Sequence, residues 1–187
     1  MFYTSIDLET TGLNPKTADI VEFAAVLGNS KNPAMKVEDL PSFHAYVVHD
    51  TYQGQPTALG MHGEIFKRIA EERKPYNYFR QGQLLIAFKA FLELNVPNFN
   101  GKITAAGKNF ASFDLQFLKK YGMDHFFGHR VLDPGSLFFD PEIDEKIPDL
   151  KTCLERSGYT HTVSHTALED AQDVVKCLNF YWMTYGS

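Results

Sequence analysis

Hydrophobic and polar residues alternate at the start of the chain, in the stretch FYTSIDLE at residues 2–9. Alternation with a period of two is typical of a strand that buries one face. Residues 19–27 and 42–48 are rich in β-branched and aromatic residues, which predicts two further strands. Three strands in succession indicate a meander at the N-terminus.

Helical patterns alternate with short apolar runs in the rest of the chain. Runs at residues 102–107 and 130–139 predict strands, and Gly122 and Gly158 stand where a left-handed residue ends a helix. Apolar spacing and helix-start or helix-stop residues predict helices at 57–61, 63–73, 82–95, 113–121, 148–157 and 167–185. We therefore expect an α/β fold, a mixed sheet covered by helices, in a single domain of residues 1–187.

The first predicted strand ends with two acids, Asp7 and Glu9. Residues two apart on a strand point to the same side, so both carboxylates share a face with Tyr3 and Ser5. Two such carboxylates repel each other unless a cation lies between them, and their oxygen atoms suit Mg²⁺ or Mn²⁺ rather than zinc. Acid pairs at strand ends are also common without a metal, so this pair alone leaves both interpretations open.

Later segments carry further candidate residues. Asp114 begins a predicted helix, where the helix dipole also favours an acid. In the stretch VSHTALEDAQ, Thr166 and Glu169 have the spacing of a capping box, which gives Glu169 a structural role. Asp170 follows in the first turn, and His165 lies just before the helix.

Four carboxylates on three predicted elements and one loop histidine form a set that suits two-metal hydrolysis of a phosphodiester. The carboxylates are those of Asp7, Glu9, Asp114 and Asp170. His165 is the candidate general base, because histidine titrates near neutral pH and can take a proton from the attacking water.

Composition and charge narrow the functional classes. The chain has 187 residues, is 44% hydrophobic and carries a net charge of −5, which disfavours a broad basic surface for duplex DNA. The two cysteines, Cys153 and Cys177, have no metal-binding spacing, so we expect free thiols in a reducing compartment. Without a signal peptide or an apolar run of membrane-spanning length, we expect a cytoplasmic protein that has no membrane partner.

Three motifs resemble those of the DEDDh 3′→5′ exonucleases, the family of the proofreading subunit of bacterial DNA polymerase III, RNase T and oligoribonuclease. They are SIDLETTGL, NFASFDLQFL and HTALEDAQ, in the family's order and spread over residues 6–175. The four residues between His165 and Asp170 mark the histidine subclass.

This resemblance implies a ribonuclease H-like fold, whose five-stranded mixed sheet carries Asp7 and Glu9 on its central strand. It also implies two divalent cations, Mg²⁺ or Mn²⁺, one between Asp7, Glu9 and Asp170 and one mainly on Asp7, with Asp114 as a further ligand. His165 would deprotonate the water, and nucleoside monophosphates would leave from the 3′ end.

The resemblance further implies a set of substrate-binding residues. Leu13 is the candidate apolar wedge between the last two bases, and Met61 and Phe113 either contact the substrate or pack in the core. Lys108 stands where many family members have a histidine. The full predicted set is Thr10, Thr11, Gly12, Leu13, Met61, His62, Asn109 and Phe113.

We expect single-stranded DNA as the substrate, with RNA or short oligoribonucleotides as the alternative. A catalytically silent nucleic-acid-binding module is a remote alternative, and a two-carboxylate glycoside hydrolase would explain neither Asp114 nor His165. The sequence identifies no polymerase partner. Because no tail follows the last predicted helix, we expect a stand-alone monomer or homodimer.

The predicted role of His165 can be tested by mutation. His165→Ala should lower the hydrolysis rate by roughly 10²–10⁴-fold, the usual contribution of a general base, with a smaller effect on metal binding. Single-turnover rates measured across pH would check this. A pH–rate profile that matches the wild type would contradict the role.

Overall fold

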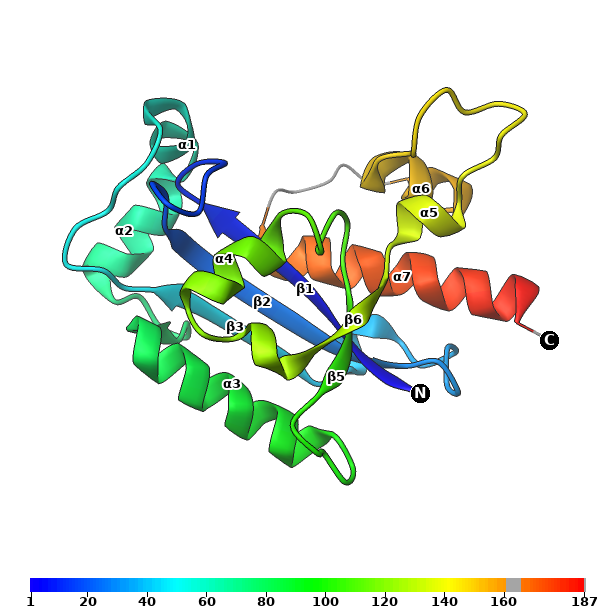
Figure 1. Cartoon of the computed structure of the whole chain (residues 1–187), viewed down its shortest axis with the longest axis horizontal. Coiled ribbons are helices and arrows are strands. Elements are labelled where there is room, and N and C mark those ends of the chain that lie inside the picture. The colour runs from blue at the N-terminus through cyan, green and yellow to red at the C-terminus, as the bar shows by residue number, and fades with distance from the viewer. Residues whose placement is uncertain (161–165, 187) are drawn as a thin grey trace.

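A six-stranded mixed sheet forms the centre of the molecule, and helices cover both of its faces (Figure 1). The structure is a computed structural model that describes residues 1–160 and 166–186. The strand order is β4-β3-β2-β1-β5-β6. The strands are β1 (Phe2–Thr10), β2 (Ile20–Asn29), β3 (Ser42–Val47), β4 (Tyr78–Phe79), β5 (Ile103–Ala106) and β6 (Phe127–Leu132).

Strands β1, β2 and β3 pair antiparallel, which confirms the predicted meander. The β1–β5, β5–β6 and β3–β4 pairs are parallel, so the sheet is mixed, as predicted. The predicted number of five strands is wrong, because β4 adds a sixth beside β3. Two residues are too few to show a hydrophobic period, so this strand could not be recognised from the pattern.

The predicted helices are present, and one short helix replaces part of a predicted strand. Gly122 and Gly158 have φ values of 69° and 82°, which confirms their left-handed conformation. Pro134 begins a short helix, so the strand predicted at 130–139 instead ends at Leu132. The α-helices are α1 (Pro56–Met61), α2 (Gly63–Glu71), α3 (Gln81–Asn95), α4 (Asp114–Lys120), α5 (Pro134–Leu137), α6 (Leu150–Arg156) and α7 (Ala167–Tyr185).

The alternation in β1 separates two parts of the core. Ile6 and Leu8 belong to the core on the side of α3 and α4, whereas Tyr3 packs with Val174 and Leu178 of α7. Because side chains alternate along a strand, Asp7 and Glu9 share the α7 side with Tyr3. The sheet therefore presents both acids to the N-terminal part of the long helix.

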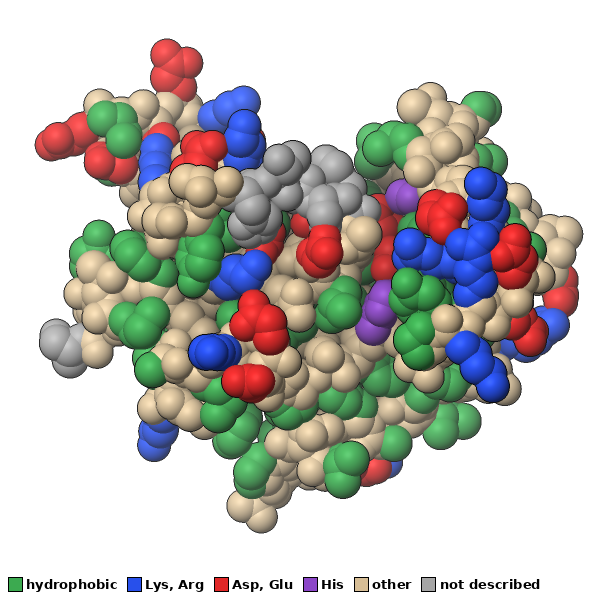
Figure 2. Space-filling view, turned by 180° about the vertical axis from the view of Figure 1, so that it is seen from behind, with side chains coloured by type: hydrophobic (Ala, Val, Ile, Leu, Met, Phe, Trp, Pro, Cys, Tyr) green, Lys and Arg blue, Asp and Glu red, His purple; other side chains and the backbone are tan. Residues whose placement is uncertain are grey.

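Charged side chains of both signs are interspersed on the face opposite to the view of Figure 1. Figure 2 shows basic and acidic side chains side by side over α2, and acidic ones at the tip of the α5–α6 corner. Cys153 and Cys177 are buried and free, as predicted. No helix in the described parts of the chain combines the length and apolar character needed to cross a membrane.

Tyr3 connects the central strand to the C-terminal half of α7. Its ring lies edge-on to Trp182, with 5.2 Å between the ring centroids. On the neighbouring strand Gly28 stands opposite Tyr3, and a Cβ at Gly28 would lie 2.1 Å from the Tyr3 ring. The Tyr3 ring therefore occupies space that is open only because Gly28 has no side chain.

We expect Gly28→Ala to destabilise the fold by about 1–3 kcal/mol, the usual cost of overpacking a core. Gly82→Ala is the matched control, because Gly82 is in α3 and a Cβ there meets nothing within 4 Å. That control should be stabilised by roughly 0.5–1 kcal/mol, since alanine favours a helix more than glycine. Urea unfolding of both variants would test this, and a Gly28→Ala variant as stable as wild type would contradict it.

Candidate active site

Three carboxylates meet where β1 ends and α7 begins. Ligand oxygen atoms of Asp7, Glu9 and Asp170 all lie within 4.8 Å of one another. Thr166 is the N-cap residue of α7, and this places Asp170 one turn into the helix, where it is 9% exposed. Glu169 is exposed, so the helix turns it away from the cluster. A strand and a helix thus bring two sequence-distant parts of the site together.

Asp114 is the fourth acid near Asp7. It is the first residue of α4, it is buried, and its carboxylate accepts a hydrogen bond from the backbone of Leu8 in β1. After burial itself, the charge of Asp114 contributes most to the raised pKa of Asp7. Asp114 does not belong to the three-residue cluster, but its charge acts on Asp7, which does.

Burial and mutual repulsion make these acids hold their protons. The pKa of Asp7 is raised well above its usual range, first by burial and then by the charges of Asp114, Asp170 and Glu9. Burial and the neighbouring Glu22 raise the pKa of Glu9 to about 8, and burial raises that of Asp114 to about 7. A divalent cation would supply the charge that lets these groups ionise together at neutral pH.

Sequence reasoning missed one buried acid next to this group. Glu22 in β2 pairs with Glu9 across the β1–β2 ladder and is 1% exposed. It accepts hydrogen bonds from His44 Nε2 at 2.6 Å and from the backbone N–H of Ala167 at 3.4 Å. The available signal was an acid inside the otherwise apolar strand IVEFAAVLGN.

Hydrogen bonds of Thr11 hold the loop after β1 in place. Its hydroxyl accepts a hydrogen bond from the Asp19 backbone N–H at 2.7 Å and donates to the Gln53 carbonyl. The Thr11 carbonyl accepts from the Gln55 N–H at 2.7 Å, and the side chain is fully buried. The Thr11 side chain therefore holds the loop in place, and its predicted contact with the substrate stays a prediction.

Helix α1 lies beside this loop (Figure 1), and both present an exposed apolar side chain. Leu13 is 74% exposed and Met61 is 72% exposed, so Met61 does not pack in the core. His62 Nε2 donates to the Thr10 carbonyl at 3.0 Å, which ties the end of α1 to the end of β1. Gly12 is buried, and its carbonyl accepts the Thr10 hydroxyl at 2.9 Å.

The remaining predicted residues lie at the turn from β5 to α4 or outside the described chain. Asn109 is exposed in a left-handed turn with φ of 59°, and its N–H donates to Asp133 Oδ2 at 2.9 Å. Phe113 is half-buried, with its ring 5.2 Å from that of Phe117. His165 lies outside the described residues, so its role stays a prediction.

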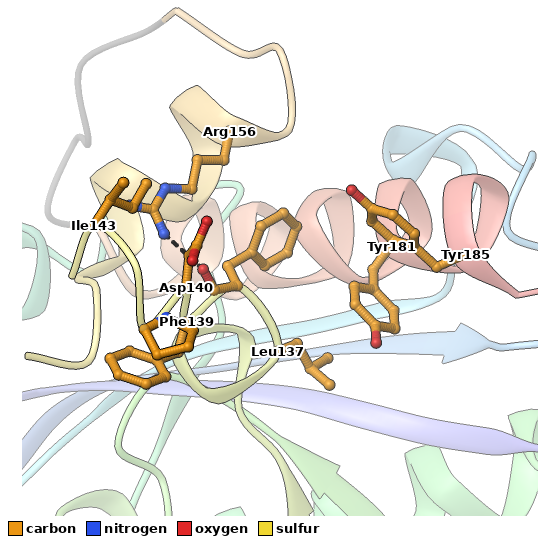
Figure 3. Close-up of a pocket in the computed structure, with 9 residues that line it drawn as sticks. Leu137, Phe139, Asp140, Ile143, Arg156, Tyr181 and Tyr185 are labelled. Atoms are coloured by element: carbon orange, nitrogen blue, oxygen red, sulfur yellow. Dashed lines mark hydrogen bonds between the residues drawn. The ribbon is translucent and has the colours of Figure 1, made fainter.

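A separate pocket of about 570 Å³ lies between the α5–α6 loop and the C-terminal half of α7 (Figure 3). Tyr181 lines it and follows Asp170 by eleven residues, which corresponds to about 16 Å along a helix. Arg156, which also lines the pocket, is paired with Asp144 at 2.6 Å. This pocket is therefore distinct from the carboxylate site.

Comparison with known proteins identifies the family. The sequence profile of the RNase_T exonuclease family matches residues 4–178. The chain belongs to this exonuclease family. The match confirms the predicted relationship to the DEDDh 3′→5′ exonucleases and the ribonuclease H-like fold.

Two relatives of this exonuclease are similar over nearly their whole length. An oligoribonuclease of Ectopseudomonas mendocina (strain ymp) is 26% identical over 187 residues, covering 94% of this chain and 91% of the relative. An oligoribonuclease of Buchnera aphidicola subsp. Schizaphis graminum (strain Sg) is 26% identical over 179 residues, covering 94% and 88%. Exonucleases of this family generally use divalent metal ions, and the oxygen donors of Asp7, Glu9 and Asp170 fit such an ion.

The raised pKa values predict how pH affects the metal-free exonuclease. Unfolded Glu9 releases its proton near 4.5, whereas folded Glu9 keeps it until about pH 8. Between these values the folded state binds more protons, so the contribution of Glu9 to stability falls as pH rises. Because a bound cation removes this penalty, Mg²⁺ should raise the melting temperature more at pH 8 than at pH 5.

Thermal unfolding in EDTA and in Mg²⁺ at both pH values would measure this difference. Asp7→Asn is the control, because it removes one ligand and part of the repulsion. It should be at least as stable as wild type in EDTA and should lose most of the gain from Mg²⁺. An equal gain in wild type and variant would show that Mg²⁺ binds elsewhere.

Proposed function

We propose that this exonuclease removes nucleoside monophosphates from the 3′ end of short RNA oligomers. The observation that carries the proposal is the cluster of Asp7, Glu9 and Asp170 beside a loop with an exposed Leu13. The names of both relatives favour RNA over the single-stranded DNA that was our first expectation. The proposed substrate is therefore the RNA that the sequence analysis gave as the alternative to single-stranded DNA.

The distribution of charge supports a short substrate. Arg73 pairs with Glu64, Arg80 with Asp50 and Arg156 with Asp144, so these guanidinium groups are already matched by acids. Figure 2 likewise shows basic side chains mixed with acidic ones over α2 on that face. Long nucleic acids are held by many phosphate contacts, whereas a terminal nucleotide can be held by stacking and local contacts.

In the proposed reaction, water attacks the phosphorus of the last phosphodiester and the bond to the 3′-oxygen of the preceding nucleotide breaks. That oxygen takes up a proton, and the 5′-phosphate leaves with the terminal nucleoside. When bound, divalent cations activate the water and stabilise the leaving oxygen. Asp7, Glu9, Asp170 and Asp114 would hold them, and His165 would accept the proton of the water.

The loop after β1 and helix α1 are suited to hold the terminal nucleotide. Leu13 and Met61 offer exposed apolar surface on the loop after β1 and on α1, and His62, the residue after Met61, lies 3.6 Å from Glu9. A base can pack against such surface. The hydrogen bonds of Thr11 and the bond from His62 to the Thr10 carbonyl fix the loop before any substrate arrives. A loop ordered in advance loses less conformational entropy on binding.

A time course on short single strands tests the proposal. We expect RNA of two to ten nucleotides to be shortened from the 3′ end with Mg²⁺ or Mn²⁺, faster than DNA of the same sequence. Strands labelled at either end give the direction, and a blocked 3′ end should stop the reaction. Asp7→Asn should be inactive although folded.

Each deviation from this result has a distinct meaning. Internal cuts would contradict an exonuclease, and faster loss of DNA would restore our first expectation for the substrate. A folded wild type without activity on any strand would support the silent binding module. Activity retained in Asp7→Asn would contradict the metal site.

A further inference from the structure

The proposed reaction assigns no role to Glu22, although this acid is buried next to the site. It is 1% exposed and stands opposite Glu9 in the β1–β2 ladder. Among the described residues, the carboxylates grouped closely enough to hold an ion are those of Asp7, Glu9 and Asp170, without Glu22. A buried carboxylate is costly unless it is paired and hydrogen-bonded, so its partners show what it does.

Glu22 joins strand β3 to the start of helix α7. One carboxylate oxygen lies 2.6 Å from His44 Nε2 on β3, and the other accepts the N–H of Ala167 at 3.4 Å. Ala167 is the first residue of α7, where the backbone N–H groups have no partner within the helix and the helix dipole attracts negative charge. Glu22 thus fastens the start of α7 to the sheet.

His44 is itself held by the neighbouring aromatic residues. Its ring meets Tyr46 and Tyr76 edge to face, with centroids 5.3 and 6.0 Å away. Asn77 Nδ2 also donates to the His44 carbonyl at 3.1 Å. These contacts fix the position of the His44 ring. The 2.6 Å contact with His44 in turn fixes the position of the Glu22 carboxylate.

We propose that Glu22 and His44 are positioning residues that fix the first turn of α7 and thereby the distance from Asp170 to Asp7 and Glu9. Asp170 lies three residues after Ala167, within one turn, so a shift of the helix start moves its carboxylate. The inference rests on the proposed metal site. Removal of residues that orient metal ligands without touching the metal typically lowers metal affinity or activity by about 10–100-fold.

Metal binding without substrate tests the inference directly. In calorimetric titrations with Mn²⁺, Glu22→Ala should bind the ion about 10–100-fold more weakly than wild type. Glu22→Gln keeps the shape and a hydrogen-bond acceptor, so it should stay within a few-fold of wild type. Glu145→Gln removes a charge from an exposed loop and is the matched control, with no expected change.

Hydrogen exchange in the metal-free protein supplies a second measurement. The amides of residues 170–173 should exchange faster in Glu22→Ala than in wild type, while those of α3 should not change. Turnover at saturating Mn²⁺ should recover most of the loss, because the ligands themselves remain. If Glu22→Ala does not fold, His44→Ala replaces it in both measurements. The His44 ring is 20% exposed and is not in the core, so this variant should fold, and it should show weaker Mn²⁺ binding and faster exchange at residues 170–173.

Three results would overturn the inference. They are unchanged Mn²⁺ affinity in Glu22→Ala, equal losses in Glu22→Gln and Glu22→Ala, and wild-type affinity and exchange in His44→Ala. Equal losses would mean that only the negative charge matters. Because Mn²⁺ binding is measured without RNA, a failure of the proposed substrate would leave this test intact.

Discussion

Repulsion between carboxylates buried in one place is the constraint on which the rest of the structure depends. Asp7, Glu9 and Asp170 have ligand oxygens within 4.8 Å of one another, and Asp114 adds its charge to Asp7. Such charges interact more strongly where water is removed. Without a cation the acids avoid this repulsion by holding protons, which costs stability as pH rises, so the apolar core must supply the stability that their proximity removes.

The fold meets this constraint by placing the acids on elements that are stabilised elsewhere. Strand β1 lies inside the sheet, and its other face packs into the core through Ile6 and Leu8. Helix α7 is held by Val174 and Leu178, which lie one and two turns beyond Asp170. The acids can therefore stay close together even without a cation, ready to receive one.

The sequence predicted the elements whose signal is local. Alternation placed Asp7 and Glu9 on one face of β1, and glycines marked two helix ends. What it could not predict depends on contacts across the chain. Strand β4 is too short for a period, and the position of Glu22 beside Glu9 follows from the β1–β2 register. The hydrogen bonds that bury the Thr11 side chain join it to Asp19 and Gln53, so its structural role is apparent only in three dimensions.

Helix α7 is attached to the sheet at both ends, by Ala167 to Glu22 and by Trp182 to Tyr3. Each residue added to a helix turns all that follows by about 100°. An insertion or deletion between Asp170 and Trp182 would therefore break one attachment or the other. Substitution of the outward-facing residues of this segment leaves both attachments in place, whereas a change in its length removes one.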